Sequence, residues 1–281
     1  MTVKEILQFS KNELNDFDSA MLDAEVLLSF VLEKDKAWIY ARLDKEIKNK
    51  DLKKFKKLID KRKKGVPAAY LIGYKEFFGL NFEVNKNVLI PRPETEMLVE
   101  KTIDLVGNKK NIKLLEIGTG SGCIIISLAK NLEVKFVASD VSKKALKIAK
   151  KNAIKNNVLG KIKFVKSDLL KNIKEEKFDI IVANLPYLDI NHKNLLESSE
   201  TRGLKFEPQQ ALYSGEDGLD LYRELFLQIA ELDNKPKFIV CELGDKQADK
   251  FERIVKKSFE NCKINFVKDA KGLRHVGIIE L

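Results

Sequence analysis

A repeated pattern of strand, turn and helix over the second half of the chain constrains its fold more than any other feature. The apolar runs that have the length of buried strands are 114–117, 135–139, 162–165, 178–183 and 238–242. Stretches with apolar residues at helical spacing separate these runs, which is typical of parallel strands joined by helical crossovers. Two further runs, 264–268 and 275–281, have only six residues between them, too few for a crossover. We therefore predict a doubly wound, mostly parallel α/β sheet with an antiparallel hairpin at one edge.

The N-terminal part of the chain has a different pattern. Apolar residues recur at helical spacing from Val3 to about Leu71, and no strand-like alternation occurs among them. Between residues 74 and 90, apolar and polar residues alternate around Gly79-Leu80-Asn81, which predicts a β-hairpin that turns there. The expected organisation is a small all-α domain (1–73), a hairpin linker (74–90) and an α/β domain (91–281).

Length and composition fit a globular protein of two domains. The chain has 281 residues, of which 44% are hydrophobic and 33% charged. No apolar run approaches the ~20 residues of a membrane span, and the first residues lack the basic and apolar regions of a signal peptide. We expect a cytoplasmic protein with no membrane partner.

The cysteines and histidines predict neither a disulfide framework nor a metal site. Cys123, Cys241 and Cys262 are far apart and odd in number, and we expect all three to be reduced and the first two to be buried. His192 and His275 have no carboxylate or cysteine at ligand spacing. No metal is expected, and neither histidine is assigned any chemistry.

The net charge of +10 is concentrated in one segment. Between Lys45 and Lys64, eleven basic residues accompany three acidic ones. Such a face attracts polyanions or acidic proteins, but it is also typical of a solvated helix whose lysine stems cover apolar surface. Charge alone does not decide between these interpretations.

A glycine-rich loop connects the first predicted strand of the sheet to a helix that begins at about Cys123. The loop consists of Gly118, Thr119, Gly120, Ser121 and Gly122. Glycines at this place let a ligand approach the backbone. Because Cys123 stands where the dinucleotide fingerprint has its third glycine, a nucleoside without phosphates fits better than a dinucleotide.

Acidic residues follow the next two strands at the sheet edge where ligands bind in open α/β folds. Asp140, twenty-two residues after Gly118, stands where a carboxylate receives the hydroxyls of a ribose. Asp140 is not needed as a helix cap, because Ser142 can serve. Asp168 can accept from an adenine amino group while Leu169 covers the ring, and the alternative is that Asp168 is a turn residue.

The tetrapeptide Asn184-Leu185-Pro186-Tyr187 follows the fourth strand of the sheet. A side-chain amide followed by a proline-restricted backbone offers acceptors in a defined geometry to a planar NH2 group. The alternative is a strand-to-loop turn in which asparagine and proline only end the strand.

The order of these motifs resembles that of the class I S-adenosylmethionine-dependent methyltransferases, whose fold has a seven-stranded sheet. The resemblance implies S-adenosylmethionine as the cofactor, bound by Gly118, Thr119, Gly120, Ser121, Gly122, Asp140, Asp168, Leu169 and Asn184. The catalytic residues that it implies are Asn184, Leu185, Pro186 and Tyr187. In that family the reactive NH2 donates to the asparagine side-chain oxygen and to the next carbonyl, and the aromatic ring packs against the planar group. This chain has Leu185 where the motif has its first proline, and Pro186 still biases Leu185 toward an extended backbone.

A second set of segments is similar to the release factor N5-glutamine methyltransferases, the PrmC/HemK family. The segments are 67–80, 89–96, Glu207-Pro208, Ala211-Leu212, Gly215, 217–219 and 242–244. The resemblance implies a helical domain that docks the protein substrate and a catalytic domain that methylates the glutamine of a Gly-Gly-Gln motif. It also implies a substrate-side role for Arg92 and Glu94, although Pro91 and Pro93 are equally typical of a stiff interdomain linker.

Three functions therefore remain open. The first is N5-methylation of release factors by a monomer that needs no nucleic acid and no metal. The second is an N6-adenine methyltransferase acting on DNA or RNA, which shares the catalytic motif and would use the basic face, but no separate target-recognition domain is apparent. The third is a cofactor-binding module without catalysis, which only Leu185 favours.

Overall fold

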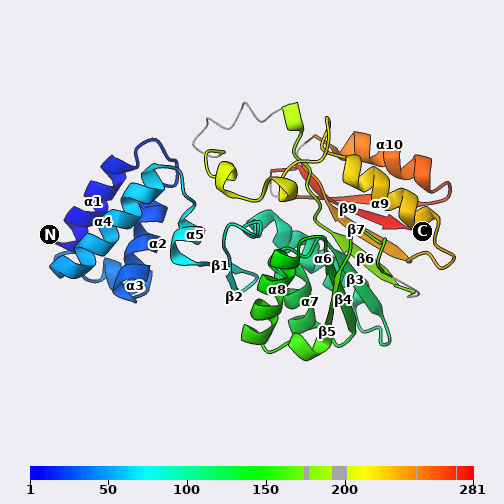
Figure 1. Cartoon of the computed structure of the whole chain (residues 1–281), viewed down its shortest axis with the longest axis horizontal. Helices are drawn as coiled ribbons and strands as arrows, with labels where there is room; N and C mark the ends of the chain where they lie inside the picture. The colour runs from blue at the N-terminus through cyan, green and yellow to red at the C-terminus, as the bar shows by residue number, and fades with distance from the viewer. Residues whose placement is uncertain (174–176, 192–200, 245, 270) are drawn as a thin grey trace. The chain divides into compact units, whose positions relative to one another are not determined.

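The computed structural model describes residues 1–173, 177–191, 201–244, 246–269 and 271–281, so His192 lies outside the described residues. The chain forms two compact units (Figure 1). One unit comprises residues 1–74 and 194–206, and the other comprises residues 75–193 and 207–281. The predicted domain boundaries at 73/74 and 90/91 stay a prediction.

The first unit is helical. Its elements are α1 (Val3–Glu13), α2 (Ala20–Leu32), α3 (Lys36–Tyr40), α4 (Asn49–Lys63), α5 (Ala68–Ile72) and the 3-10 helix η4 (Leu204–Phe206). Helix α1 begins in a capping box, in which Thr2 accepts from the Glu5 backbone and Glu5 accepts from the Thr2 backbone. Helices α2 and α4 are joined by a buried ion pair of 2.7 Å between Asp23 and Arg62. The guanidinium of Arg62 also lies 3.8 Å from the centre of the Phe17 ring.

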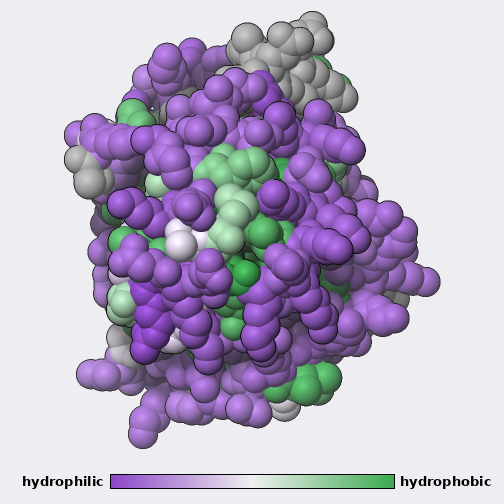
Figure 2. Space-filling view, turned by 90° about the vertical axis from the view of Figure 1, so that its left-hand side faces the viewer, coloured by the Kyte–Doolittle hydropathy of each residue, from purple (hydrophilic) through white to green (hydrophobic). Residues whose placement is uncertain are grey.

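The basic segment forms the exposed side of α4. Its exposed lysines are Lys50, Lys53, Lys54, Lys56, Lys57, Lys61 and Lys63. Two of them lie over aromatic rings, Lys54 over Phe30 at 5.2 Å and Lys56 over Phe9 at 5.1 Å. Figure 2 shows the side of the molecule on which α1 and the N-terminus lie in Figure 1: hydrophilic side chains dominate, and a smaller hydrophobic patch is exposed among them. Part of the lysine face therefore covers apolar surface, as one of the two interpretations predicts.

A β-hairpin of strands β1 (Tyr74–Phe77) and β2 (Leu80–Glu83) follows the first five helices. Its two-residue turn has positive φ at both central positions, 51° at Phe78 and 69° at Gly79. The predicted turn at Gly79-Leu80-Asn81 was therefore one residue too late, because Leu80 and Asn81 already belong to β2. The Asn152 side chain ties the hairpin to the glycine loop by donating to the carbonyls of Glu83 and Ser121.

The second unit is built around a seven-stranded sheet of order β5-β4-β3-β6-β7-β9-β8. Its strands are β3 (Lys113–Ile117), β4 (Lys135–Asp140), β5 (Ile162–Lys166), β6 (Ile180–Ala183), β7 (Phe238–Glu242), β8 (Lys263–Lys268) and β9 (Arg274–Glu280). The first five strands are parallel, β9 is antiparallel to β7, and β8 pairs with β9 as the edge hairpin. The predicted fold is confirmed.

Helices cover both faces of this sheet (Figure 1). They are α6 (Glu96–Val106), α7 (Cys123–Asn131), α8 (Lys143–Lys155), α9 (Asp220–Ala230) and α10 (Ala248–Ser258), with short 3-10 turns η1 (Pro93–Thr95), η2 (Leu159–Lys161) and η5 (Gln209–Ala211). Successive strand residues point to opposite faces. Leu114 thus packs in the core with α6 and α7, whereas Leu115 packs in the core with α9 and α10. Burial on both faces explains why the strands are continuous apolar runs.

Three further features concern the cysteines, possible membrane-spanning helices and possible metal ligands. Cys123, Cys241 and Cys262 are all free, and Cys123 and Cys241 are buried as predicted. Within the described ranges, no helix is long and apolar enough to cross a membrane. The same residues contain no group of three or more His, Cys, Asp or Glu placed to hold a metal ion.

Candidate active site

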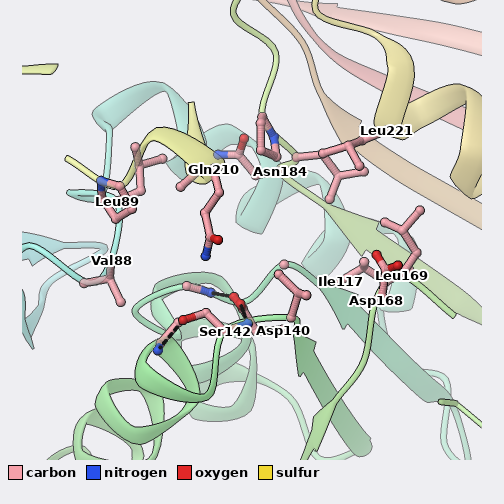
Figure 3. Close-up of a pocket in the computed structure, with 18 of the residues that line it drawn as sticks. Val88, Leu89, Ile117, Asp140, Ser142, Asp168, Leu169, Asn184, Gln210 and Leu221 are labelled. Atoms are coloured by element: carbon pink, nitrogen blue, oxygen red, sulfur yellow. Dashed lines mark hydrogen bonds between the residues drawn. The ribbon is translucent and has the colours of Figure 1, made fainter. Parts of the chain in front are cut away.

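A cavity of about 760 Å³, counting its open mouth, lies at the C-terminal ends of β3, β4, β5 and β6 (Figure 3). Ligands of open α/β folds bind at this edge of the sheet. The predicted site residues that line it are Gly118, Gly120, Asp140, Asp168, Leu169, Asn184, Leu185 and Pro186. The glycine loop that follows β3 and the polar side chains at the ends of β4, β5 and β6 are therefore brought to one cavity.

The glycine loop is held to the sheet by its own backbone. The N–H groups of Gly118 and Thr119 both donate to the carbonyl of Ser139 at 2.9 Å. Thr119, Ser121 and Gly122 were predicted to bind the cofactor, but they are not among the described residues that line the cavity. The Thr119 hydroxyl instead donates to Glu116, and the Ser121 carbonyl accepts from Asn152.

Gly122 has a packing role. Its φ is +83°, and a Cβ atom there would lie 2.8 Å from Ile126 Cδ1 and 3.2 Å from Ala149 Cβ. Glycine is therefore required for the loop to approach α8 closely.

Asp140 is buried at the end of β4, and each of its oxygens accepts one backbone N–H at 2.8 Å, from Gly120 and from Ser142. Burial raises the pKa of this carboxyl, and the two N–H groups oppose the shift. Ser142 caps α8 by accepting from the Ala145 N–H at 3.2 Å, as predicted. Asp140 is thus free of the cap role and lies at the cavity (Figure 3).

Asp168 and Leu169 lie beyond the end of β5. Asp168 is half-exposed and forms a 2.6 Å ion pair with Lys171. Leu169 is buried, with a φ of 47° that turns the chain at the cavity wall. Asp168 therefore lies at the cavity with one carboxylate oxygen already engaged by Lys171.

The side chain of Asn184 has a defined orientation. Its Nδ2 donates to the hydroxyl of Thr95 at 3.2 Å, and Thr95 is buried in η1. Because the amide is planar, the acceptor Oδ1 lies on the other side of the group.

The backbone of the tetrapeptide is anchored by a residue of α9 and by the residue that precedes α10. The N–H of Leu185 donates to the Tyr222 hydroxyl at 3.4 Å, and the carbonyl of Tyr187 accepts from Gln247 at 2.9 Å. The Tyr187 hydroxyl points to Glu242 Oε1 at 3.5 Å, and burial raises the pKa of this hydroxyl. Tyr187 itself is not among the described residues that line the cavity.

Two buried carboxyl groups were missed by the sequence reasoning. Burial raises the pKa of Glu116 to about 8 and that of Glu242 to about 7, and the hydrogen bond from the Thr119 hydroxyl opposes the shift of Glu116. Each glutamate has one oxygen, Oε1 of Glu116 and Oε2 of Glu242, without a hydrogen-bond partner among the described residues. Glu242 was within a segment of the family resemblance, whereas Glu116 carried no signal beyond its place at the end of an apolar run.

Arg92 and Glu94, predicted on the substrate side, do not line the cavity in the described structure. Arg92 instead pairs with the buried Glu207 at 2.6 Å, and Glu207 also accepts from the Ile90 N–H at 2.9 Å. Glu94 is exposed. This arrangement holds the proline-containing segment against residues just before η5.

The cavity is also lined by residues for which no ligand-binding role was predicted. They are Asn87, Val88, Leu89, Ile117, Val141, Ser142, Ala145, Ser167, Pro208, Gln210, Ala211 and Leu221. The side chain of Gln210 points into the cavity toward Asp140 and Ser142 (Figure 3). Leu89, Pro208 and Ala211 belong to the segments that carry the family resemblance, and this resemblance is the signal that could have identified them.

Comparisons with known proteins match both parts of the chain. The family model described as PrmC N-terminal domain matches residues 5–73, and the model described as methyltransferase small domain matches residues 94–199. The release factor glutamine methyltransferase of Dictyoglomus turgidum is 36% identical, over 98% of this chain and 96% of that protein. The bifunctional methyltransferase of Rickettsia felis is 34% identical over 96% of this chain but only 56% of that protein, so the chain spans about half the length of such relatives.

Solved structures share the fold. The catalytic domain of hMettl16 in complex with the MAT2A 3'UTR hairpin 1 has a TM-score of 0.59 and 19% identity, covering 86% of this chain and 84% of that one. The N-terminal domain of human METTL16 in complex with SAH has a TM-score of 0.51 and 21% identity, covering 72% and 76% of the two chains. At these identities the likeness concerns the fold alone.

Proposed function

Because this chain belongs to the family of release factor glutamine methyltransferases, we propose that it methylates the side-chain nitrogen (N5) of the glutamine in the Gly-Gly-Gln motif of peptide chain release factors. S-adenosylmethionine is the proposed methyl donor. The observation that carries the proposal is the oriented amide of Asn184 in the wall of a cavity that Asp140 also lines.

The residues present fit S-adenosylmethionine. Gly118 and Gly120 allow close approach to the backbone, and the Asp140 carboxyl, with one backbone N–H on each oxygen, keeps lone pairs to accept from ribose hydroxyls. Asp168 would accept from the adenine amino group, and Leu169 would cover the ring. The cofactor would supply a methyl group on a sulfonium, which needs no metal for its transfer.

The tetrapeptide would bind and orient the glutamine. The Asn184 Oδ1 and the Leu185 carbonyl would accept the two hydrogens of the substrate NH2, which would direct the nitrogen lone pair toward the methyl group. Tyr187 would pack near the planar amide. The rate enhancement would come from positioning and from preorganised dipoles, not from a strong base.

The proposed partner is a release factor, and the proposed docking surface lies on residues 1–73, over which the family model of the PrmC N-terminal domain matches. The division into a docking domain, a hairpin linker (74–90) and a catalytic domain (91–281) is part of this proposal. In its simplest form, the proposal is that the enzyme acts as a monomer in the cytoplasm and does not require nucleic acid.

The direct test is methyl transfer to a purified, unmethylated release factor. With labelled S-adenosylmethionine, we expect label on the Gly-Gly-Gln peptide, located by mass spectrometry. A release factor with this glutamine changed to asparagine is the control and should stay unlabelled. Asn184→Ala should lower turnover about 100-fold or more while binding of S-adenosylhomocysteine stays within about threefold. An unlabelled wild-type substrate would contradict the proposal.

The second candidate is N6-methylation of adenine in DNA or RNA, favoured by the exposed lysines of α4. The same labelled assay with single-stranded DNA and RNA oligonucleotides tests it. Transfer to nucleic acid without transfer to the release factor would replace the leading proposal.

A further inference from the structure

We propose that Gln247 is a positioning residue that holds the tetrapeptide 184–187 in the conformation that methyl transfer requires. This inference rests on the proposed function, which places the substrate amide against the tetrapeptide. Gln247 is not among the described residues that line the cavity, so its effect on the reaction would pass through the backbone that it binds.

The side-chain amide of Gln247 is hydrogen-bonded to three backbone groups. Its Nε2 donates to the carbonyl of Tyr187 at 2.9 Å and to the carbonyl of Asp217 at 3.0 Å. Its Oε1 accepts from the N–H of Gly244 at 2.9 Å. These groups belong to the end of the tetrapeptide, to the turn before α9 and to the connection that follows β7. One amide therefore joins three segments that are distant or separate in the chain.

The three partners allow only one orientation of this amide. A carbonyl oxygen only accepts, and a backbone N–H only donates. A half-turn of the amide would place Oε1 against the carbonyl oxygens of Tyr187 and Asp217, and it would place the NH2 group against the Gly244 N–H. Gln247 is therefore a tether of defined geometry.

Gln247 does not serve its own helix. It directly precedes α10, where a side chain often caps the first N–H groups of a helix, but no such hydrogen bond is present in the described structure. The residue before it, Lys246, has a φ of 65°, which non-glycine residues rarely adopt. The turn thus presents Gln247 to Tyr187 and Asp217 instead of to α10.

Two glycines make the close approach of these segments possible. A Cβ atom at Gly218 would overlap the Tyr187 carbonyl oxygen and would lie 2.6 Å from Gln247 Nε2. A Cβ atom at Gly244 would lie 2.9 Å from Gln247 Oε1 and 3.0 Å from Tyr187 Cδ2. Backbone therefore encloses the Gln247 amide on two sides, and the Tyr187 ring lies against the connection after β7.

The tether restricts the tetrapeptide because its other end is also held. The Leu185 N–H donates to the Tyr222 hydroxyl at 3.4 Å. Pro186 lies between the two anchored residues, and its ring fixes its φ. With both ends held, the Leu185 carbonyl and the Tyr187 ring have little freedom to turn. Catalysis by positioning depends on such preorganisation.

The kinetic test uses Gln247→Glu, which separates the tether from a purely local role. The new carboxyl group can still accept from the Gly244 N–H. It has no donor when ionised and one when protonated, so it cannot satisfy both carbonyls in either state. We expect kcat to fall about 10- to 100-fold, with the KM for release factor and the Kd for S-adenosylhomocysteine within about threefold of wild type. A wild-type kcat would show that only the Gly244 contact matters and would overturn the proposal.

The matched control is Asn131→Leu. The amide of Asn131, at the end of α7, also donates to a backbone carbonyl, that of Ser127 at 2.8 Å, but Asn131 is not among the described residues that line the cavity. Its kcat should stay within about twofold of wild type. Rates are divided by the concentration of sites that bind S-adenosylhomocysteine, so that partial unfolding of a variant does not count as slower catalysis.

Gly218→Ala displaces the same carbonyl from another side. We expect it to lower kcat about tenfold or more, again with little change in the Kd for S-adenosylhomocysteine. Gly79→Ala is its control, because Gly79 has a φ of +69°, close to the +78° of Gly218, and a Cβ atom there would have no atom within 4 Å. Equal kcat values for the two variants would contradict the proposed tether.

A measurement on the free protein separates this inference from the proposed function. The N–H of Leu188 belongs to the same peptide group as the Tyr187 carbonyl, and it donates to the Leu212 carbonyl at 2.8 Å. We expect this N–H to exchange with deuterium at least about tenfold faster in Gln247→Glu than in wild type, with exchange in β3 unchanged. Unchanged exchange at Leu188 overturns the positioning role whatever the substrate is. Faster exchange in the variant, with no transfer to release factor by wild type, contradicts only the proposed function.

Discussion

The hydroxyl of Tyr222 accepts a hydrogen bond from the backbone N–H of Leu185 at 3.4 Å. A proline at position 185, as in the motif that this chain resembles, would have no N–H to satisfy. Leucine adds a donor in a buried place, and Tyr222 meets it while also hydrogen-bonding to the carbonyls of Ala183 and Glu242. The Tyr222 hydroxyl thus links Leu185, which stands where the motif has a proline, to the ends of β6 and β7.

We therefore expect Tyr222→Phe to destabilise the protein by about 1–3 kcal/mol, because buried backbone groups lose their partner. The kcat of this variant should fall several-fold, because the Leu185 carbonyl would be held less rigidly. In a Leu185→Pro background the kinetic cost of Tyr222→Phe should be smaller, since no N–H remains at position 185. Urea unfolding and steady-state kinetics of the two single variants and the double variant measure this coupling. Tyr74→Phe, at an exposed tyrosine, is the control, and additive kinetic effects would contradict the prediction.

Asp140 should contribute more to cofactor binding than Asp168. Asp140 is buried and also holds the Gly120 and Ser142 backbone, whereas Asp168 is half-exposed and paired with Lys171. We expect Asp140→Ala to raise the Kd for S-adenosylhomocysteine about 10- to 100-fold, and Asp168→Ala to raise it only several-fold. Isothermal titration calorimetry measures both values. The opposite ranking would show that the adenine side of the cavity dominates binding.

Gly122→Ala is expected to be more destabilising than an equivalent change at an open glycine. The new Cβ would meet Ile126 Cδ1 at 2.8 Å and Ala149 Cβ at 3.2 Å. Gly272 has the same φ of +83°, and a Cβ atom there would have no atom within 4 Å. Gly272→Ala therefore measures the cost of a positive φ at alanine without a steric contact. We expect Gly122→Ala to lose about 1–3 kcal/mol more in unfolding free energy than Gly272→Ala. Equal losses in urea unfolding would mean that α8 simply moves aside.

The free energy of unfolding should fall as the pH rises from about 4.5 to about 8. Burial raises the pKa of Glu116 from 4.5 to about 8 and that of Glu242 to about 7. The folded state therefore binds these protons more tightly than the unfolded chain, and the associated stability is complete below pH 4.5 and is lost as the pH passes 7 and then 8. For Glu116 this loss is on the order of 3 to 5 kcal/mol.

Glu116→Gln should therefore flatten the dependence of unfolding free energy on pH. Urea unfolding followed by circular dichroism between pH 5 and pH 8.5 measures the slope. Glu133→Gln, which removes an exposed carboxyl from the same unit, is the control for the lost charge. An unchanged slope in Glu116→Gln would contradict the predicted role of burial.

Local pattern was sufficient to predict the architecture of this protein. Buried parallel strands are continuous apolar runs and amphipathic helices repeat at 3.6 residues, so the strands, the edge hairpin and the helical N-terminal part could all be predicted. The ends of the parallel strands meet at one edge, so the cavity residues Gly118, Asp140, Asp168 and Asn184 could be predicted as well. The likeness of short segments indicated the family that the comparisons then identified.

Only the tertiary structure decided which polar groups are partners. Thr95 reaches Asn184 across 89 positions of the chain, and Tyr222 reaches Leu185 across 37. The tertiary structure also distinguished Gly118 and Gly120, which line the cavity, from Gly122, which packs on α8. Periodicity reports which face of an element is buried, but the partner of a buried donor depends on strand register and on where distant loops close. For this reason the sequence predicted an amide at the sheet edge, and the fold determined which way that amide points.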